Sequence, residues 1–348
     1  MRLRKIVVTG ASGFVGSCVV EALFVAGGYE IVPTGRRLLA GGRVARFGCR
    51  LRPADLTHRE AVDELVQGAY AIVHCAFGAD SDQEKATRTL LLAAAGAGVR
   101  TFIHVSTTEI YAAQDGTIDE DSPIQSEGPG YGAIKGRIDS LVRSNFERFQ
   151  SLVILRPGII YGPLGDQWTI VPIRRLLAGW KPVAEELQGT ANLVHIADVC
   201  RTIEQILARP PLGLRIYNVV GPEVVSWMEY FERLAQALGV AVPSSAEDQV
   251  AGEKVEVGFV RTLLRLLPTS FRRKVTFFVM TFPAGKRMIA RWQRLHFLAL
   301  MSADRALYGR KVRYSNARLK GDGLMPRVGL VEGIQQSAAW AREIGFAQ

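Results

Sequence analysis

Tyr131 and Lys135 are the pair of residues whose types and spacing can do acid–base chemistry in this chain. Residues four apart on a helix share a face, so the ammonium of Lys135 is expected beside the phenol of Tyr131. A nearby positive charge favours the phenolate and lowers the pKa of a tyrosine toward neutral pH. Such a phenol can pass a proton to or from a carbinol oxygen. Because Tyr-x-x-x-Lys is common by chance, its meaning depends on the elements that position it.

A glycine-rich turn lies upstream of this pair. Gly10, Gly13 and Gly16 follow a short apolar strand expected at Lys5–Thr9 and open a helix expected at Gly13–Ala26. Glycines at this spacing permit a tight turn, close approach of a pyrophosphate, and close packing of the helix on the sheet. The turn therefore predicts a dinucleotide site. With it, the tyrosine can exchange a proton with the substrate while a nicotinamide exchanges a hydride.

Residues at the end of the second expected strand, Glu30–Thr34, indicate which dinucleotide is used. NAD needs an acid there for its ribose hydroxyls, whereas NADP needs a cation for its 2′-phosphate. The chain has Gly35, Arg36 and Arg37 after this strand and no acid. This predicts NADP, with Arg36 as the main phosphate contact and Arg37 in support. NAD is the alternative if the two arginines are only a solvated loop.

Other polar residues have competing interpretations. Asp55 can accept a hydrogen bond from the adenine amino group or cap the helix near Arg59. His74 and His104 lie in or beside buried strands and are interpreted as satisfied core residues, and His195 as structural. No metal is predicted, since these histidines have no ligand partners at usable spacing and the four cysteines show no C-x-x-C pattern.

Short apolar strands alternate with helices through the first half of the chain, which predicts a doubly wound parallel sheet of the Rossmann type in an α/β fold. The runs lack polar alternation, as expected when helices cover both faces of a sheet. A smaller C-terminal substrate-binding domain is expected to follow. Further strands are expected at 71–75, 101–106, 152–156 and 215–219, and further helices at 59–66, 82–97, 131–149, 195–207, 227–238 and 326–345.

The 348 residues are enough for two lobes. Residues 1–165 with 192–220 are expected to form the NAD(P)-binding domain, and 166–191 with 221–348 the substrate-binding lobe. The N-terminal apolar run is too short for a signal sequence, and no stretch reaches the roughly 18 apolar residues of a membrane-spanning helix. Together with the scattered cysteines, this predicts a cytoplasmic protein.

The net charge of +10 is concentrated in one segment. Residues 261–313 hold thirteen lysines or arginines and one acid, a balance of +12, which leaves −2 for the rest of the chain. Phenylalanines and a tryptophan lie among these cations. Three interpretations stay open: a cover over the substrate cleft whose arginines bind a phosphate, a peripheral contact with an anionic inner membrane face, or an ordinary helical lid. Nucleic acid is not expected, because no recognition motif accompanies the charge.

These motifs together resemble the extended short-chain dehydrogenase/reductase family, the NAD(P)-dependent epimerase/dehydratase group. The likeness includes the glycine-rich turn, Ala54-Asp55-Leu56, Val73-His74-Cys75-Ala76, 104–111 (HVSTTEIY), Tyr131 with Lys135, 155–163 (LRPGIIYGP), 194–199 (VHIADV) and 326–330 (PRVGL). The resemblance implies a homodimer formed through helices near 82–97 and 131–149. It also implies the following cofactor-binding residues: Gly10, Ser12, Gly13, Phe14, Val15, Gly16, Arg36, Arg37, Asp55, Leu56, Cys75, Ala76, Phe77, Tyr131, Lys135 and Pro157.

The resemblance also implies a catalytic trio of Thr107, Tyr131 and Lys135. Thr107 would hold the substrate oxygen beside the phenol, and Lys135 would also bind the nicotinamide ribose. Substrate contacts are expected at Thr108, Glu109 and Gly158. Thr108 replaces the aspartate of the dehydratase signature, which disfavours dehydration, and Glu109 is either an auxiliary acid or a structural ion pair.

Two departures concern the substrate. Gly158 replaces the asparagine with which sugar-nucleotide members contact the diphosphate, and residues 189–193 lack the expected arginine. The resulting expectation is an NADP-dependent oxidoreductase that interconverts a secondary alcohol and a ketone on a small molecule, as a ketoreductase on a sugar-like or apolar polycyclic substrate. The alternatives are a nucleotide-sugar epimerase and a non-catalytic NADP-sensing protein.

Overall fold

The computed structural model describes residues 3–36, 41–77, 82–112, 115–241, 297–298 and 300–347. The chain divides into two compact units. The first comprises Met1–Gly165, Thr190–Val225 and Lys311–Gly333, and the second Asp166–Gly189, Ser226–Arg310 and Ile334–Gln348. Residues 190–191, 221–225 and Lys311–Gly333, which the sequence interpretation placed in the substrate lobe, thus belong to the first unit.

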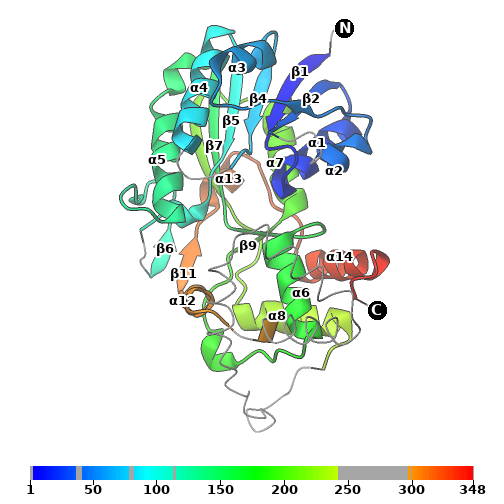
Figure 1. Ribbon diagram of the computed structural model, residues 1–348. Coiled ribbons are helices and arrows are strands. Elements are labelled where there is room, and N and C mark those ends of the chain that lie inside the picture. Colours follow the sequence, from blue (N-terminus) through cyan, green and yellow to red (C-terminus); the bar gives the residue numbers. More distant parts are fainter. Residues whose placement is uncertain are drawn as a thin grey trace, which may run out of the picture. The chain divides into compact units, whose positions relative to one another are not determined.

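The first unit is built on a sheet of seven strands, all parallel (Figure 1). The strand order is β10-β7-β5-β4-β1-β2-β3, so the chain starts at β1 and winds outward in both directions. The predicted doubly wound α/β fold is therefore confirmed. The strands are β1 (Arg4–Thr9), β2 (Tyr29–Gly35), β3 (Arg52–Pro53), β4 (Ala71–His74), β5 (Thr101–Val105), β7 (Ser151–Pro157) and β10 (Gly213–Val219).

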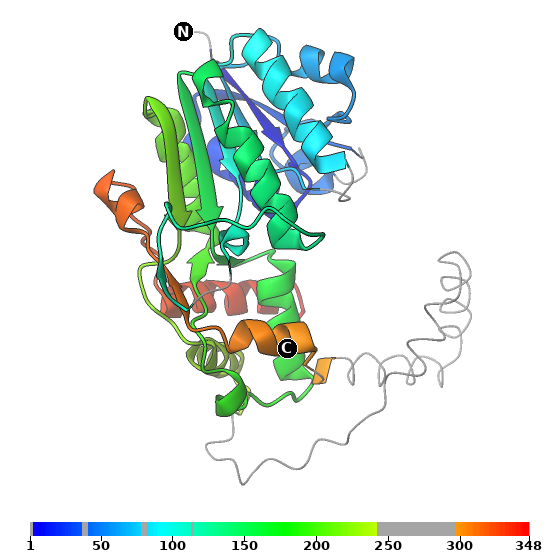
Figure 2. The same cartoon turned by 90° about the vertical axis from the view of Figure 1, so that its left-hand side faces the viewer.

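Helices cover both faces of this sheet (Figures 1 and 2). Successive side chains of a strand point to opposite faces, so Ile6 and Val8 pack into one hydrophobic cluster and Val7 into the other. Both faces are buried, which is why the strands read as continuous apolar runs. One face is covered by α1 (Phe14–Ala26), α2 (Gly42–Ala45) and α7 (Ile196–Ala208), and the other by α3 (Arg59–Val66), α4 (Gln83–Gly96) and α5 (Tyr131–Arg143).

Two small parallel ladders complete the first unit. β6 (Gly116–Ile118) pairs with β11 (Val312–Tyr314), and β8 (Ile159–Tyr161) pairs with β9 (Leu193–His195). The β6–β11 pairing attaches the segment around residue 312 to the first unit. A short helix, α13 (Ala317–Gly321), follows β11.

The second unit has an aromatic core. Its helices are α6 (Val171–Leu177), α8 (Trp227–Leu238), α12 (Ser302–Tyr308) and most of α14 (Leu330–Glu343). Trp227, Phe231 and Tyr308 lie in mutual ring contact, and Arg175 forms an ion pair with Asp304 at 2.6 Å. Most of the basic segment, residues 261–296 and 299, lies outside the described residues. Within the described part of the chain, no helix has the length and apolar character required to span a bilayer.

Candidate active site

The glycine-rich turn between β1 and α1 has no room for side chains. Gly10 has a φ of +67°, and a Cβ atom built on it would lie 2.7 Å from the backbone nitrogen of Ala76. A Cβ on Gly16 would lie 2.3 Å from the carbonyl oxygen of Gly10. The amide of Gly13 donates to that same carbonyl at 2.9 Å. The turn is therefore tight, and its backbone packs directly on the end of β4.

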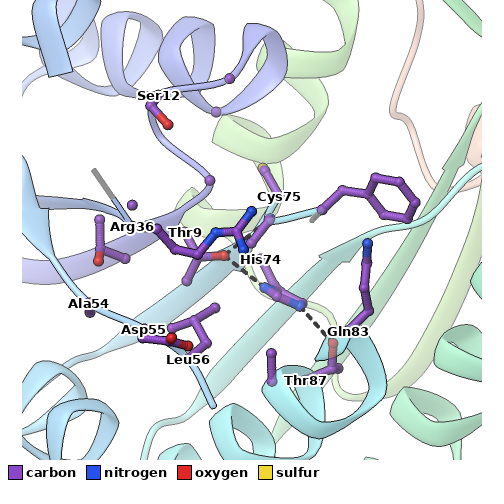
Figure 3. Close-up of a pocket in the computed structure, with 18 of the residues that line it drawn as sticks. Thr9, Ser12, Arg36, Ala54, Asp55, Leu56, His74, Cys75, Gln83 and Thr87 are labelled. Atoms are coloured by element: carbon purple, nitrogen blue, oxygen red, sulfur yellow. Dashed lines mark hydrogen bonds between the residues drawn. The ribbon is translucent and has the colours of Figure 1, made fainter. Parts of the chain in front are cut away.

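A cavity of about 610 Å³ opens beside this turn (Figure 3). Twelve of the sixteen predicted cofactor residues line this cavity. Three others are not part of the lining: Tyr131, Lys135 and Pro157. The sixteenth, Arg37, lies outside the described residues. The twelve are Gly10, Ser12, Gly13, Phe14, Val15, Gly16, Arg36, Asp55, Leu56, Cys75, Ala76 and Phe77. The lining also includes ten residues that the sequence interpretation missed: Thr9, Thr34, Gly35, Ala54, Thr57, His74, Asp82, Gln83, Ala86 and Thr87.

His74 links three elements beneath the cavity. Its Nδ1 lies 2.7 Å from Oγ1 of Thr9 on β1, and its Nε2 lies 3.1 Å from Oγ1 of Thr87 on α4 (Figure 3). Thr9 Oγ1 also accepts a hydrogen bond from the amide of Ala76. Burial lowers the pKa of His74 to about 3, so the ring is neutral at physiological pH. The prediction of a satisfied core histidine is confirmed here.

Asp55 and Arg36 bring charge to the rim of the cavity. The Asp55 carboxylate accepts hydrogen bonds from the amide and hydroxyl of Thr57, which lower the pKa of Asp55, and the charge of Arg36 lowers it slightly further. The N-cap residue of α3 is His58. The capping interpretation of Asp55 is therefore wrong, because Asp55 precedes the helix by too many residues and closes its own turn with Thr57.

The shape and donors of this cavity fit a dinucleotide. The turn places backbone amides at the N-terminus of α1, a thirteen-residue helix whose dipole favours an anion. A side chain at Gly10 or Gly16 would close the approach to these amides. Arg36 supplies a cation on the β2 side of the same cavity. These features suit a diphosphate held by the turn and a polar group held near Arg36.

Tyr131 and Lys135 occupy successive turns at the start of α5. Tyr131 is the first residue of the helix and is 48% exposed, whereas Lys135 is only 5% exposed. The Lys135 ammonium donates to the carbonyl oxygen of Val105 at the end of β5, at 3.2 Å. Burial lowers the pKa of Lys135 to about 8. The lysine is thus held at the carboxyl end of the sheet, one turn below the phenol.

The acidity of the phenol differs from the sequence prediction. Burial raises the pKa of Tyr131, a hydrogen bond with Thr107 partly opposes this rise, and the Glu109 carboxylate adds to it. Lys135 is not among the groups that shift this pKa, and its ammonium donates to the Val105 carbonyl. The predicted lowering of the Tyr131 pKa by Lys135 is therefore absent from this structure.

Phe77 joins the cavity to this acid–base pair. It lines the cavity, and its ring meets the Tyr131 ring edge-on with centroids 5.1 Å apart. The Lys135 nitrogen lies 5.0 Å from the centre of the same ring. Thr107, Tyr131 and Lys135, which the sequence grouped as a trio, therefore lie together and border the dinucleotide cavity through Phe77.

The predicted substrate residues have different environments. Thr108 is buried, as is its neighbour Thr107. Glu109 is partly exposed, and its amide donates to the Thr107 hydroxyl at 3.2 Å, which fixes the turn after β5. A Cβ on Gly158 would lie 2.2 Å from the carbonyl oxygen of Asn192. Pro157 is the buried last residue of β7.

The two remaining buried histidines differ from each other. His104 makes no hydrogen bond from either ring nitrogen to any described residue, so the interpretation of it as satisfied is wrong. Burial of the ring and the nearby charge of Lys135 lower the pKa of His104 well below the usual range. His195 caps α7 by accepting from the amide of Ala197, in line with a structural role. Among the described residues, no group of three His, Cys, Asp or Glu could hold a metal ion.

Comparison with known families gives one match. The model of the NAD dependent epimerase/dehydratase family matches residues 6–220, which include the glycine-rich turn, the acid–base pair and the central sheet.

Matches to individual relatives extend over most of the length of each relative. The chain is 29% identical to the low-salt glycan biosynthesis protein Agl12 of Haloferax volcanii, over 70% of this chain and 84% of that protein. It is 28% identical to a dTDP-glucose 4,6-dehydratase of Streptomyces niveus (68% and 78%) and to a ceramide reductase of Caulobacter vibrioides (67% and 70%). Among solved structures, a UDP-glucuronic acid 4-epimerase of Bacillus cereus in complex with UDP-glucuronic acid and NAD shares the fold. It has a TM-score of 0.68 and 19% identity, with 98% of this chain and 99% of that one covered.

Proposed function

The chain belongs to the NAD dependent epimerase/dehydratase family, and from this premise we propose that it is a nucleotide-sugar epimerase. It would oxidise one secondary carbinol of the sugar to a ketone and reduce it again from the other face. The observation that carries the proposal is the grouping of Thr107, Tyr131 and Lys135 beside a cavity that fits a dinucleotide.

The chain's own residues handle the proton. When bound, the dinucleotide supplies the hydride acceptor and donor. The Tyr131 phenolate takes the proton of the carbinol hydroxyl during oxidation, and the phenol returns it to the carbonyl oxygen during reduction. Thr107, which hydrogen-bonds the phenol, orients the same oxygen. Lys135 holds a positive charge at the carboxyl end of β5, one turn below the phenol, and with substrate and cofactor bound this charge is expected to favour the phenolate.

Dehydration is disfavoured by residue 108. Elimination of water from a sugar needs an acid to protonate the leaving hydroxyl, and a threonine hydroxyl is too weak an acid for that role. Thr108 is also buried. Glu109 is the one carboxyl in this turn, and its charge acts on Tyr131. Several relatives are named as dehydratases, but Thr108 of this chain supplies no such acid.

A second candidate is net reduction of a ketone by NADPH. Arg36 at the cavity rim and the absence of an acid at the end of β2 favour a 2′-phosphate and hence NADP. A reductase exchanges NADPH at each turnover, whereas an epimerase regenerates its own cofactor. The relative named as a ceramide reductase also supports an apolar substrate.

The two candidates differ in their products and in their use of cofactor. The purified protein is incubated with a panel of UDP- and dTDP-sugars and of ketones, and products are identified by NMR while absorbance at 340 nm is followed. Epimerisation predicts a stereoisomer of unchanged mass and no net absorbance change. Reduction predicts stoichiometric NADPH loss. Either activity should fall by about a thousandfold or more in Tyr131→Phe, and turnover that survives this change would refute the proton role of Tyr131.

Cofactor preference is tested by titration. Arg36→Ala should weaken NADP binding by about tenfold and leave NAD binding nearly unchanged, because only the 2′-phosphate loses its cation. Arg46→Ala is a suitable control, since this arginine pairs with Glu21 and lies outside the cavity lining. Tighter binding of NAD than NADP, with a ratio that Arg36→Ala does not change, would exclude the preference.

A further inference from the structure

Phe77 has an unusual combination of neighbours for a partly exposed ring. It is 45% exposed, yet it contacts two functional side chains at once. Its ring meets Tyr131 in a T-shaped arrangement, with an interplanar angle of 73°, and lies 5.0 Å from the Lys135 nitrogen. The same side chain lines the dinucleotide cavity. A ring that served only to fill the core would be buried.

The contacts of Phe77 with Tyr131 and with Lys135 both restrict the orientation of the partner side chain. Edge-to-face aromatic pairs have a preferred mutual orientation, so Phe77 restricts the rotation of the Tyr131 ring, which is half-exposed and begins its helix. The face of a phenyl ring attracts an ammonium, so Phe77 adds a second contact to Lys135 beside its hydrogen bond to the Val105 carbonyl. The ring also limits access of water to the lysine, whose burial is the main cause of its low pKa.

We propose that Phe77 is a positioning residue that orients Tyr131 and Lys135 at the mouth of the dinucleotide cavity. The inference rests on the proposed function, in which this pair handles the substrate proton. Phe77 itself transfers no proton. Its ring contacts both the phenol and the ammonium, and these contacts keep the two groups in a fixed relative position while ligands bind and dissociate.

The test compares three substitutions of Phe77 with a matched control. Phe77→Tyr keeps the ring, Phe77→Leu keeps apolar bulk without a ring, and Phe77→Ala removes both. Phe24→Ala is the control, because Phe24 is also half-exposed and also pairs with a ring, that of Phe47, but lies outside the cavity lining. Urea midpoints measured first identify any variant that loses its fold.

Turnover and binding are then separated. Phe77→Ala should lower kcat by about tenfold or more, since small misplacements of a catalytic group are costly. The dissociation constant for ADP, which probes the cavity without a nicotinamide, should stay within about twofold. Phe77→Leu should lower kcat less than Phe77→Ala does, and Phe77→Tyr, which keeps the ring, less again. Phe24→Ala should retain the parent kcat.

A readout without turnover completes the test. In ligand-free protein labelled with ¹⁵N-lysine, the Lys135 signal is assigned by its absence in Lys135→Met and titrated with pH. Phe77→Ala should raise the pKa of Lys135 from about 8 toward its usual value, because water reaches the ammonium. The inference fails if either kcat or the Lys135 titration in Phe77→Ala matches that in Phe24→Ala. If Tyr131→Phe retains full turnover, the proposed function fails instead, and the titration still reports on Phe77.

Discussion

Gly132→Ala is a sharp test of how the catalytic turn is held against α5. A Cβ on Gly132 would lie 2.2 Å from the carbonyl oxygen of Glu109 and 2.4 Å from Nε2 of Gln125. The Gln125 amide donates to that same carbonyl at 2.9 Å, and the Glu109 amide donates to the Thr107 hydroxyl. A methyl group at 132 therefore pushes on the backbone that carries Thr107.

The size of the effect follows from opposing contributions. Alanine gains at most about 1 kcal/mol over glycine here, because that value applies to a helix interior and Gly132 is the second residue of α5. Overpacking against backbone costs about 1–3 kcal/mol, and loss of the Gln125 hydrogen bond costs about 1 kcal/mol more. The expected net loss of stability is about 1–3 kcal/mol. Restoring an ordinary contact requires a shift of about 1 Å at residue 109, and a shift of that size near a catalytic hydroxyl can lower kcat by about a hundredfold.

Gly130→Ala provides the matched control. Gly130 precedes α5 as its N-cap, has a φ of −69°, and has no atom within 4 Å of a built Cβ. Its replacement should cost about 0.5 kcal/mol, from the weaker N-cap preference of alanine. Urea unfolding of both variants gives the stability difference, provided that the slope m is unchanged, and initial rates give kcat.

The result that would refute this reasoning is equally definite. If Gly132→Ala matches Gly130→Ala in urea midpoint and in kcat, the 107–111 turn does not depend on close contact with α5. A stable Gly132→Ala with a lowered kcat would instead show that the turn adapts by moving Thr107, at little cost in folding energy.

Three further predictions concern the buried polar network and the turn. Asp139→Asn should lower the free energy of unfolding by about 3–5 kcal/mol, measured in urea, because it leaves the fully buried Arg156 guanidinium without its carboxylate. Stability should fall as pH drops below about 6.5, the ordinary pKa of histidine, because the unfolded chain binds a proton at His74 that the folded protein resists until pH about 3. His74→Gln should make that part of the pH profile shallower without abolishing it, because the lowered pKa values of His104 and His195 act in the same range, and an unchanged slope would contradict the assignment. Gly10→Ala should weaken dinucleotide binding more than tenfold, as measured by calorimetry. The backbone at position 10 has a φ of +67°, which alanine rarely adopts, and the added methyl group would collide with the backbone after β4.

The sheet was predictable because each central strand is a short apolar run with turn signals on both sides. Ile6, Val7 and Val8 face two different helix layers, so no polar residue interrupts them. The three-residue ladders β6–β11 and β8–β9 were not predictable. Three residues carry no periodicity, and the partner of Val312–Tyr314 lies almost two hundred positions earlier in the chain.

The cofactor site was predictable at the strand ends and not on the helices. Gly10, Asp55 and Ala76 follow β1, β3 and β4 of a parallel sheet, and the carboxyl ends of these strands meet at one edge. Thr87 lies within α4, where spacing alone does not say which face meets the cavity. The sequence offered one signal for Thr87, namely the polar residue His74 in a buried strand. A buried histidine needs hydrogen-bond partners, and in the structure these partners are Thr9 and Thr87.

The spacing of Tyr131 and Lys135 fixed their shared face and left the direction of the ammonium open. That direction depends on Val105, an acceptor thirty residues away in the sequence, and the lysine is not among the groups that shift the pKa of the phenol. Two residues that share a helix face are therefore not necessarily coupled electrostatically.

Gly158 gives a physical reason why a sugar-nucleotide contact familiar from related enzymes is missing here. A side chain at this position would meet the Asn192 carbonyl at 2.2 Å and a Val220 methyl at 3.0 Å. Asn192 has no freedom to retreat, because its side-chain amide donates to the Val312 carbonyl and its side-chain oxygen accepts from the Tyr314 amide. The β6–β11 ladder thus holds the backbone that excludes an asparagine at 158. If the substrate is a nucleotide sugar, its diphosphate must be bound by other residues of this chain.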